Sequence, residues 1–330
     1  MAGEKVTTGL DRVLVLEVAR VTEVAAIAAA RWRGKGQNMA ADKAAVDAMR
    51  KELGRINIRG KVVIGEGEMD EAPMLYIGEE VGTGEGPRVD IAVDPLEGTT
   101  ICAKDMPNAL AVIAISEEGG LLNAPDMYMD KIAIGPGYPE GIIDLDMPVP
   151  EVLAALAKAK GVPVSEITAC LLDRPRHADI IEAVRKAGGA IRLIPDGDIA
   201  GVIWTTDPHQ TGIDVYLGSG GAPEGVLAAA ALRCIGGQMQ GRLRPSNAEE
   251  IKRAATMGIT DIKKKFSLLE MSSGDVIFSA TGVTSGSLLE GVRFRGDFAE
   301  TETVVLRSKT GTVRRIKTTF RDIGTKGLLL

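Results

Sequence analysis

Residues 89–100 read VDIAVDPLEGTT, an apolar run that ends in two carboxylates, a glycine and two hydroxyls. Residues 89–93 are apolar apart from Asp90 and β-branched at three positions, which predicts a strand that delivers Asp94 at its carboxyl end. The proline that follows fixes a turn, Glu97 points back three residues later, and Thr99 opens the next element with free backbone N–H groups. Since ligands of α/β sheets bind beyond the carboxyl ends of strands, this stretch predicts a binding site.

Two further acidic clusters follow strand-like runs. Residues 64–68 read IGEGE around Glu66, and residues 220–225 read GGAPEG around Glu224, where we expect a loop between a strand and a helix. Carboxylates without histidine or cysteine suit hard cations such as Mg²⁺ or Mn²⁺, with water and substrate phosphate completing the coordination shell. The chain has two histidines, so neither a His-rich zinc site nor a Ser-His-Asp triad is expected.

Composition narrows the classes of function. Apolar residues make up 45% of the 330 residues, aromatic residues 3%, and the net charge is −6, which suits a soluble α/β protein and not a nucleic-acid binder. Three cysteines without a CxxC motif suggest a reducing compartment. Charges interrupt residues 10–30 at helical spacing, so we expect an amphipathic helix there, no membrane span and a cytoplasmic protein. No phosphate-binding loop of the G-x-x-x-x-G-K-[ST] type occurs.

Hydrophobic periodicity predicts alternating elements and two halves, 1–147 and 148–330. The first half would carry most metal ligands, and the second the substrate-binding residues and Glu224. The segment Met147–Pro150 is interpreted as a linker, because each proline blocks regular structure. Helices are expected at 8–31, 40–53, 151–160, 177–187, 198–204 and 226–235, and strands at 61–64, 89–93, 109–115, 167–172, 190–194, 213–217, 238–243, 276–281, 303–308 and 312–319.

The string Asp94-Pro95-Leu96-Glu97-Gly98-Thr99 resembles the signature of the lithium-sensitive, metal-dependent phosphomonoesterases. The rest of the chain is similar to one branch of them, class II fructose-1,6-bisphosphatase. The matching motifs include 42–50, 63–68, 71–76, 123–129, 175–177, 195–198, 220–225 and 278–282. The resemblance implies a layered α/β/α/β/α sandwich of the inositol monophosphatase type, a homo-oligomer (dimer or tetramer), and hydrolysis of the 1-phosphate of fructose 1,6-bisphosphate by metal-activated water.

The resemblance also implies roles for individual residues. It implies metal binding by Asp42, Glu66, Asp94, Glu97 and Glu224, and catalytic roles for Thr99, which orients the attacking water, and for Asp42. It implies substrate contacts by Glu97, Gly98, Thr99, Tyr128, Arg174, Pro175, Arg176, Asp196, Gly197, Asp198 and Gly221. Within this set, the guanidinium fork of Arg176 suits the second, non-reacting phosphate.

Two departures from the family pattern leave alternatives open. Glu97 stands where the superfamily usually has the shorter aspartate, and Asn38 stands where the family usually has a lysine, which Lys35 or Lys43 could replace. A dual fructose-1,6-/sedoheptulose-1,7-bisphosphatase is the nearest alternative. An inositol monophosphatase and a non-catalytic sugar-phosphate-binding protein are more distant ones. Tyr128 could instead be a core aromatic residue, and no catalytic role is expected of His177.

Overall fold

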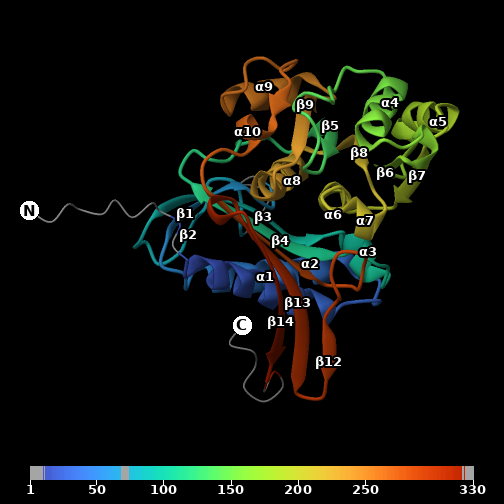
Figure 1. The fold of residues 1–330 in the computed structure, drawn as a ribbon. Helices are drawn as coiled ribbons and strands as arrows, with labels where there is room; N and C mark the ends of the chain where they lie inside the picture. The colour runs from blue at the N-terminus through green and yellow to red at the C-terminus, as the bar shows by residue number, and fades with distance from the viewer. Residues whose placement is uncertain (1–9, 11, 68–73, 322, 324–330) are drawn as a thin grey trace, which may run out of the picture.

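A computed structural model describes residues 10, 12–67, 74–321 and 323 and shows a mixed α/β protein built on two mixed sheets (Figure 1). The first sheet has the order β12-β13-β11-β4-β3-β1-β2, and β14 pairs with β13. Only β1 and β3 pair in parallel within the described part of this sheet. Its strands are β1 (Arg59–Ile64), β2 (Glu80–Val81), β3 (Arg88–Glu97), β4 (Leu110–Glu117), β11 (Val276–Gly282), β12 (Arg293–Arg295), β13 (Phe298–Arg307) and β14 (Thr312–Phe320).

The second sheet has the order β10-β9-β5-β8-β6-β7 and combines antiparallel and parallel pairs. Its strands are β5 (Tyr128–Ile134), β6 (Thr168–Leu172), β7 (Ala190–Ile194), β8 (Val215–Gly221), β9 (Gln238–Arg244) and β10 (Phe266–Ser267). Strand β5 lies between β8 and β9 and therefore sits at the centre of this sheet.

Three groups of helices cover the sheets. Helices α1 (Leu14–Ala30) and α2 (Asn38–Leu53) pack on one face of the first sheet, and α4 (Val149–Lys160) and α5 (Ala178–Lys186) pack on the outer face of the second. Helix α8 (Ala222–Ile235) contacts strands of both sheets and packs with α6 (Asp198–Trp204) in the layer between them (Figure 1). The shorter or peripheral helices are α3 (Thr99–Ala103), α7 (Pro208–Thr211), α9 (Ala248–Thr256), α10 (Leu268–Met271) and the 3₁₀ turns η1 (Val164–Glu166), η2 (Pro175–His177) and η3 (Ser308–Thr310).

Strand β4 shows why the buried strands read as continuous apolar runs. Ala111, Ile113 and Ile115 belong to the core under α1 and α2, whereas Val112 and Ala114 belong to the core around α8. Successive side chains of a strand point to opposite faces, so a strand covered on both faces must be apolar at every position. The first sheet thus has a hydrophobic core on each of its two faces.

The predicted end of the strand at 89–93 is wrong. Strand β3 continues to Glu97, and its register against β4 shifts between Asp94 and Glu97. A bulge at this point accommodates Pro95, which has no N–H to give to a ladder. The bulge places two carboxylates of one strand near each other at the edge of the middle layer.

Two other segments predicted to be irregular contain the beginnings of helices. Pro148 is the N-cap of α4 and Pro150 lies in its first turn, where a missing N–H costs no hydrogen bond, so the predicted linker is wrong. Strand β8 runs to Gly221 and α8 begins at the next residue, so residues 220–225 form a direct strand-to-helix junction and not a loop.

The predicted boundary at residues 147 and 148 does not separate the two sheets. Strand β5 precedes it and lies in the second sheet, whereas β11 to β14 follow it and lie in the first. Of the predicted segments, the start of the first helix (residues 8, 9 and 11) and the acidic stretch 68–73 lie outside the described residues. Across the described part of the chain, no helix is long and apolar enough to span a membrane.

Candidate active site

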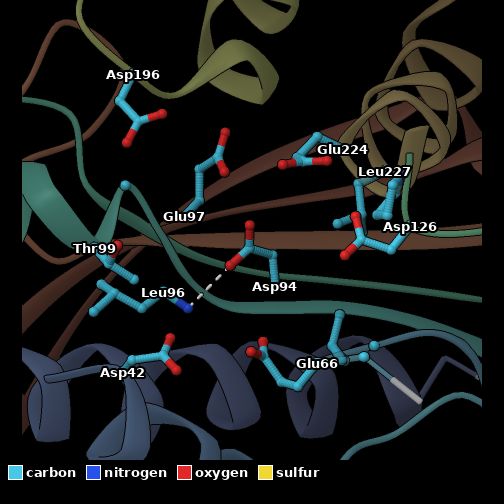
Figure 2. A pocket seen from close by; sticks show the side chains of 15 residues that line it. Asp42, Glu66, Asp94, Leu96, Glu97, Thr99, Asp126, Asp196, Glu224 and Leu227 are labelled. Atoms are coloured by element: carbon cyan, nitrogen blue, oxygen red, sulfur yellow. Dashed lines mark hydrogen bonds between the residues drawn. The ribbon is translucent and has the colours of Figure 1, made fainter. Parts of the chain in front are cut away.

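A cleft of about 370 Å³ lies where α2, β3 and α8 meet (Figure 2). Asp42 points into it from α2, Glu66 from the segment after β1, and Glu224 from the first turn of α8. Asp94 and Glu97 come from the bulge of β3. The five side chains predicted as metal ligands, which come from four separate stretches of the chain, therefore line one cavity.

Local hydrogen bonds fix the β3 end of the cleft. The carboxylate of Asp94 accepts a hydrogen bond from the backbone N–H of Leu96 at 3.1 Å, which ties the bulge together. Glu97 Oε1 accepts the backbone N–H of Ile199 at 3.2 Å, and so connects β3 to the start of α6. Gly98 is the N-cap of α3 with φ 83° and ψ 55°, a conformation that side chains disfavour, and it brings Thr99 to the cleft wall.

Seven carboxylates line the cleft, and its described lining includes no lysine, arginine or histidine. These acidic residues are Asp42, Glu66, Asp94, Glu97, Asp126, Asp196 and Glu224. Burial is the main cause of the raised pKa of each of three of them: to about 9 for Glu66, about 6 for Asp94 and about 7 for Glu224. Repulsion between neighbouring carboxylates adds to it, and the pKa of Glu97 rises well above its ordinary value for the same two reasons.

This donor set fits a divalent cation. Oxygen-only ligands suit Mg²⁺ or Mn²⁺, and bound cations offset the repulsion that buried carboxylates otherwise suffer. Without such cations a phosphate group would meet only negative charge on the cleft's described acidic wall. Among the residues that the structure describes, no group of three or more His, Cys, Asp or Glu side chains is already arranged to hold an ion.

The raised pKa values predict an inverse pH dependence of stability in the absence of metal. Folded pKa values near 9, 6 and 7 for Glu66, Asp94 and Glu224 exceed the ordinary values of 4.5, 3.8 and 4.5. At pH values between the ordinary pKa and the folded pKa of each group, the unfolded chain has released a proton that the folded chain retains. The free energy of unfolding therefore falls as pH rises. In EDTA we expect a lower melting temperature at pH 8 than at pH 5.5, by several degrees, and E66Q should reduce that difference. A melting temperature that rises over the same interval would contradict the prediction.

A second group of predicted residues lies beside the cleft without lining it. Tyr128 is 48% exposed and is not the core aromatic residue that the alternative reading predicts, whereas its neighbours Met127 and Met129 are buried. The guanidinium carbon of Arg176 stands 4.7 Å from the centre of the Tyr128 ring. Arg176 also donates from Nε and Nη2 to the carbonyl of Ser219, at 3.0 and 2.7 Å. Two of its nitrogens are therefore engaged, and the fork does not stand free as the sequence reading assumes.

Other predicted substrate residues hold the backbone around the cleft. Arg174 donates to the carbonyl of Pro195 at 2.6 Å and lies 3.7 Å from the carboxylate of Asp196, which faces the cleft. Pro175 opens the turn η2, and Gly197 caps α6 with φ 85°. These contacts anchor the segment that carries Asp196.

Gly221 and Asp198 occupy tighter positions. Gly221 has an ordinary extended backbone, but a Cβ there would overlap Oε2 of Glu224. Asp198 is 5% exposed, lies one layer behind the cleft lining, and pairs with Lys131 at 2.5 Å. His177 is buried, accepts the N–H of Ser219 on Nε2 at 2.8 Å and therefore donates from Nδ1 to the Leu172 carbonyl at 2.7 Å. That neutral, packed histidine agrees with the expectation of no catalytic role.

The structure shows what Asn38 contacts. Its amide donates to Oγ1 of Thr100 at 3.2 Å and links the start of α2 to α3. Lys35 lies over the ring of Trp32, at 5.3 Å from its centre, and Lys43 pairs with an aspartate one turn further along α2 at 3.0 Å. Neither lysine is among the residues that line the cleft, and the replacement of the family's usual lysine by one of them stays a prediction.

Two residues near the site carry no prediction from the sequence. Asp126 lines the cleft (Figure 2). It belongs to the motif 123–129, but the sequence assigns it no role, because the strand that begins two residues later is not predicted. Lys131 lies within that same strand, β5, and its burial cannot be read from the sequence.

Comparison with known proteins identifies the family. The model of the family described as "Bacterial fructose-1,6-bisphosphatase, glpX-encoded" matches residues 12–320. The chain belongs to this family. It is 49% identical over 322 residues to fructose-1,6-bisphosphatase 1 class 2 of Escherichia coli (strain K12), an alignment that covers 93% of this chain and 95% of that protein. It is equally similar to the class 2 fructose-1,6-bisphosphatase of Shigella flexneri, with the same coverage. Family membership thus bears out the resemblance, and metal dependence is a general property of these phosphatases.

Proposed function

We propose that this protein is a class 2 fructose-1,6-bisphosphatase, a phosphoric monoester hydrolase of gluconeogenesis that removes the 1-phosphate of fructose 1,6-bisphosphate. The observation that carries the proposal is the cleft of seven carboxylates, with no basic residue in its described lining, in a chain of this family. Such a cleft binds a phosphate only together with cations. Bound Mg²⁺ or Mn²⁺ would supply an acidified water and a stabilised leaving oxygen.

The residues of the chain then take distinct roles. Asp42, Glu66, Asp94, Glu97 and Glu224 would hold the cations, with Asp94 central because it lies between the α2 side and the α8 side of the cleft (Figure 2). The hydroxyl of Thr99 orients the attacking water, and Asp42 accepts its proton. Backbone N–H groups that follow Gly98 hold the reacting phosphate.

The second phosphate must bind where positive charge is found. Arg174 and Arg176 stand at the turn after β6, and Tyr128 and Gly221 face each other across β5 and β8. We place the sugar between this group and the cleft, with Pro175, Asp196 and Gly197 shaping its path. Asp198 is buried behind them and supports that path. Arg176 reaches the distant phosphate with its remaining donor or after release of the Ser219 carbonyl.

The same proposal includes the finer features that the resemblance implies. Contacts of α1 and α2 with the first sheet, of α6 and α8 between the sheets, and of α4 and α5 beyond the second support a five-layer α/β/α/β/α sandwich of the sugar-phosphatase type. We also propose a homo-oligomer, dimer or tetramer, that works in the cytoplasm. The halves 1–147 and 148–330 remain a prediction about domains.

Phosphate release from purified protein tests the function. With Mg²⁺ or Mn²⁺ we expect release from fructose 1,6-bisphosphate, with EDTA we expect none, and inositol 1-phosphate should be a poor substrate. Sedoheptulose 1,7-bisphosphate runs beside them, and comparable turnover of both bisphosphates would make the enzyme dual. A folded, metal-loaded protein that releases phosphate from none of these compounds would instead be a sugar-phosphate-binding protein.

A further inference from the structure

A buried ion pair lies directly behind the acidic cleft. Lys131 is 2% exposed, and its Nζ lies 2.5 Å from Oδ2 of Asp198, which also accepts a 3.4 Å hydrogen bond from the hydroxyl of Tyr216. A buried ammonium is costly unless it is paired, so its position in the centre of β5 calls for a physical reason. The mechanism above uses Asp198 but assigns nothing to Lys131.

The pair touches the metal-binding wall at two points. A Cβ at Gly220 would overlap Oδ2 of Asp198 and lie 3.2 Å from Nζ of Lys131, so the pair sits against the strand that leads into Glu224. On the other side, Ile199, the residue after Asp198, donates its N–H to Glu97. Asp198 is thus adjacent to two of the carboxylates proposed to hold cations.

Charge distinguishes Asp198 from those carboxylates. Among the described residues, no lysine or arginine forms a salt bridge with Glu97 or Glu224, whereas Lys131 pairs with Asp198 at 2.5 Å. An ammonium and a metal cation compete for the same carboxylate oxygen. Lys131 therefore occupies the place that a cation would otherwise take behind Glu97 and Glu224.

We propose that Lys131 is a positioning residue that keeps Asp198 out of the metal-binding set and confines the divalent cations to the front of the cleft. The inference rests on the proposed metal-binding function of that cleft. If Lys131 loses its charge, Asp198 becomes an additional, unpaired carboxylate beside Glu97 and Glu224, and the wall attracts divalent cations more strongly.

The test measures how strongly Mn²⁺ binds and stabilises the purified full-length chain, without substrate. In EDTA, Lys131→Met should lower the melting temperature, because it leaves the carboxylate of Asp198 buried without a balancing positive charge. On addition of Mn²⁺ we expect a larger rise in melting temperature than in the wild type, with a dissociation constant about tenfold lower by calorimetry. The double variant K131M/D198N should return the Mn²⁺ affinity to the wild-type value.

The chain offers a matched control. Lys160 pairs with Asp214 at the same 2.5 Å, with side chains 28% and 3% exposed, and neither lines the cleft. Lys160→Met should also lower the melting temperature in EDTA, but its Mn²⁺ dependence should equal that of the wild type. The comparison separates loss of a buried pair from a change in the metal site.

The outcomes are distinct. Unchanged or weaker Mn²⁺ affinity in K131M overturns the inference and leaves the proposed function intact. A wild-type protein that Mn²⁺ neither binds nor stabilises overturns the metal-binding function and the inference with it. If K131M does not fold, Lys131→Gln, which keeps a hydrogen-bond donor for Asp198 without the charge, is measured in its place with the same expected result.

Discussion

Replacing Asp94 by asparagine should abolish turnover and leave the fold intact. Asn keeps an oxygen that can accept the N–H of Leu96, so the bulge of β3 retains its hydrogen bond. What is lost is the negative charge at the centre of the acidic cleft, and with it the strongest attraction for the cations. We expect kcat/KM for fructose 1,6-bisphosphate to fall by about 10³-fold or more, since metal-based stabilisation contributes several kcal/mol.

The stability of the variant provides the second readout. In EDTA, D94N should melt at the same temperature as the wild type or higher, because the change removes a carboxylate whose pKa its surroundings raise to about 6. In Mn²⁺ its melting temperature should rise less than that of the wild type. Asp47→Asn makes the same change on α2, where the side chain is 45% exposed and pairs with Lys43, and it should leave both rate and metal response unchanged. A rate for D94N close to the wild-type rate would remove Asp94 from the site.

Gly221→Ala should reduce activity by about 10²-fold through a single methyl group. The backbone at Gly221, with φ −63° and ψ 143°, permits any residue, so alanine brings no backbone strain. Its Cβ would, however, overlap Oε2 of Glu224 and push that carboxylate from its place at the start of α8. Displacement of a catalytic group by about 1 Å can cost a factor of this size.

A substitution at a second glycine distinguishes the displacement of Glu224 from a general effect of replacing glycine by alanine. Gly54 ends α2 with φ −61°, and a Cβ there would meet only backbone oxygens at 3.6 and 3.7 Å. Gly54→Ala should therefore keep full activity and Mn²⁺ affinity, whereas G221A should lose affinity for Mn²⁺ together with activity. Equal activities of the two variants would show that Glu224 does not depend on this contact.

Much of the fold could be read along the chain because central strands such as β4 and β11 are covered on both faces. The apolar runs at 109–115 and 276–281 and the helix at 198–204 appear at, or within two residues of, their predicted ends. Strand β5 was not predicted, because its sequence YMDKIAI places a tyrosine, an aspartate and a lysine among its apolar residues. Helix α9 was also missed, since its sequence AEEIKRAAT is polar overall and Ala254 is its one buried residue.

The sequence by itself determined the family and predicted the chemistry of the site. Carboxylates spaced through one chain, the string at 94–99 and the near absence of histidine already indicate an oxygen-ligand metal centre that acts on a phosphate. These properties are local: they depend on residue type and order, and both can be read directly.

Only the tertiary structure decided how those groups stand toward one another. It shows that the fork of Arg176 is engaged with Ser219, that Asn38 joins α2 to α3, and that Lys131 is buried against Asp198. Each of these contacts joins residues more than 40 positions apart. Charge pairing and burial across such separations depend on how the two sheets pack around α8, which no local pattern encodes.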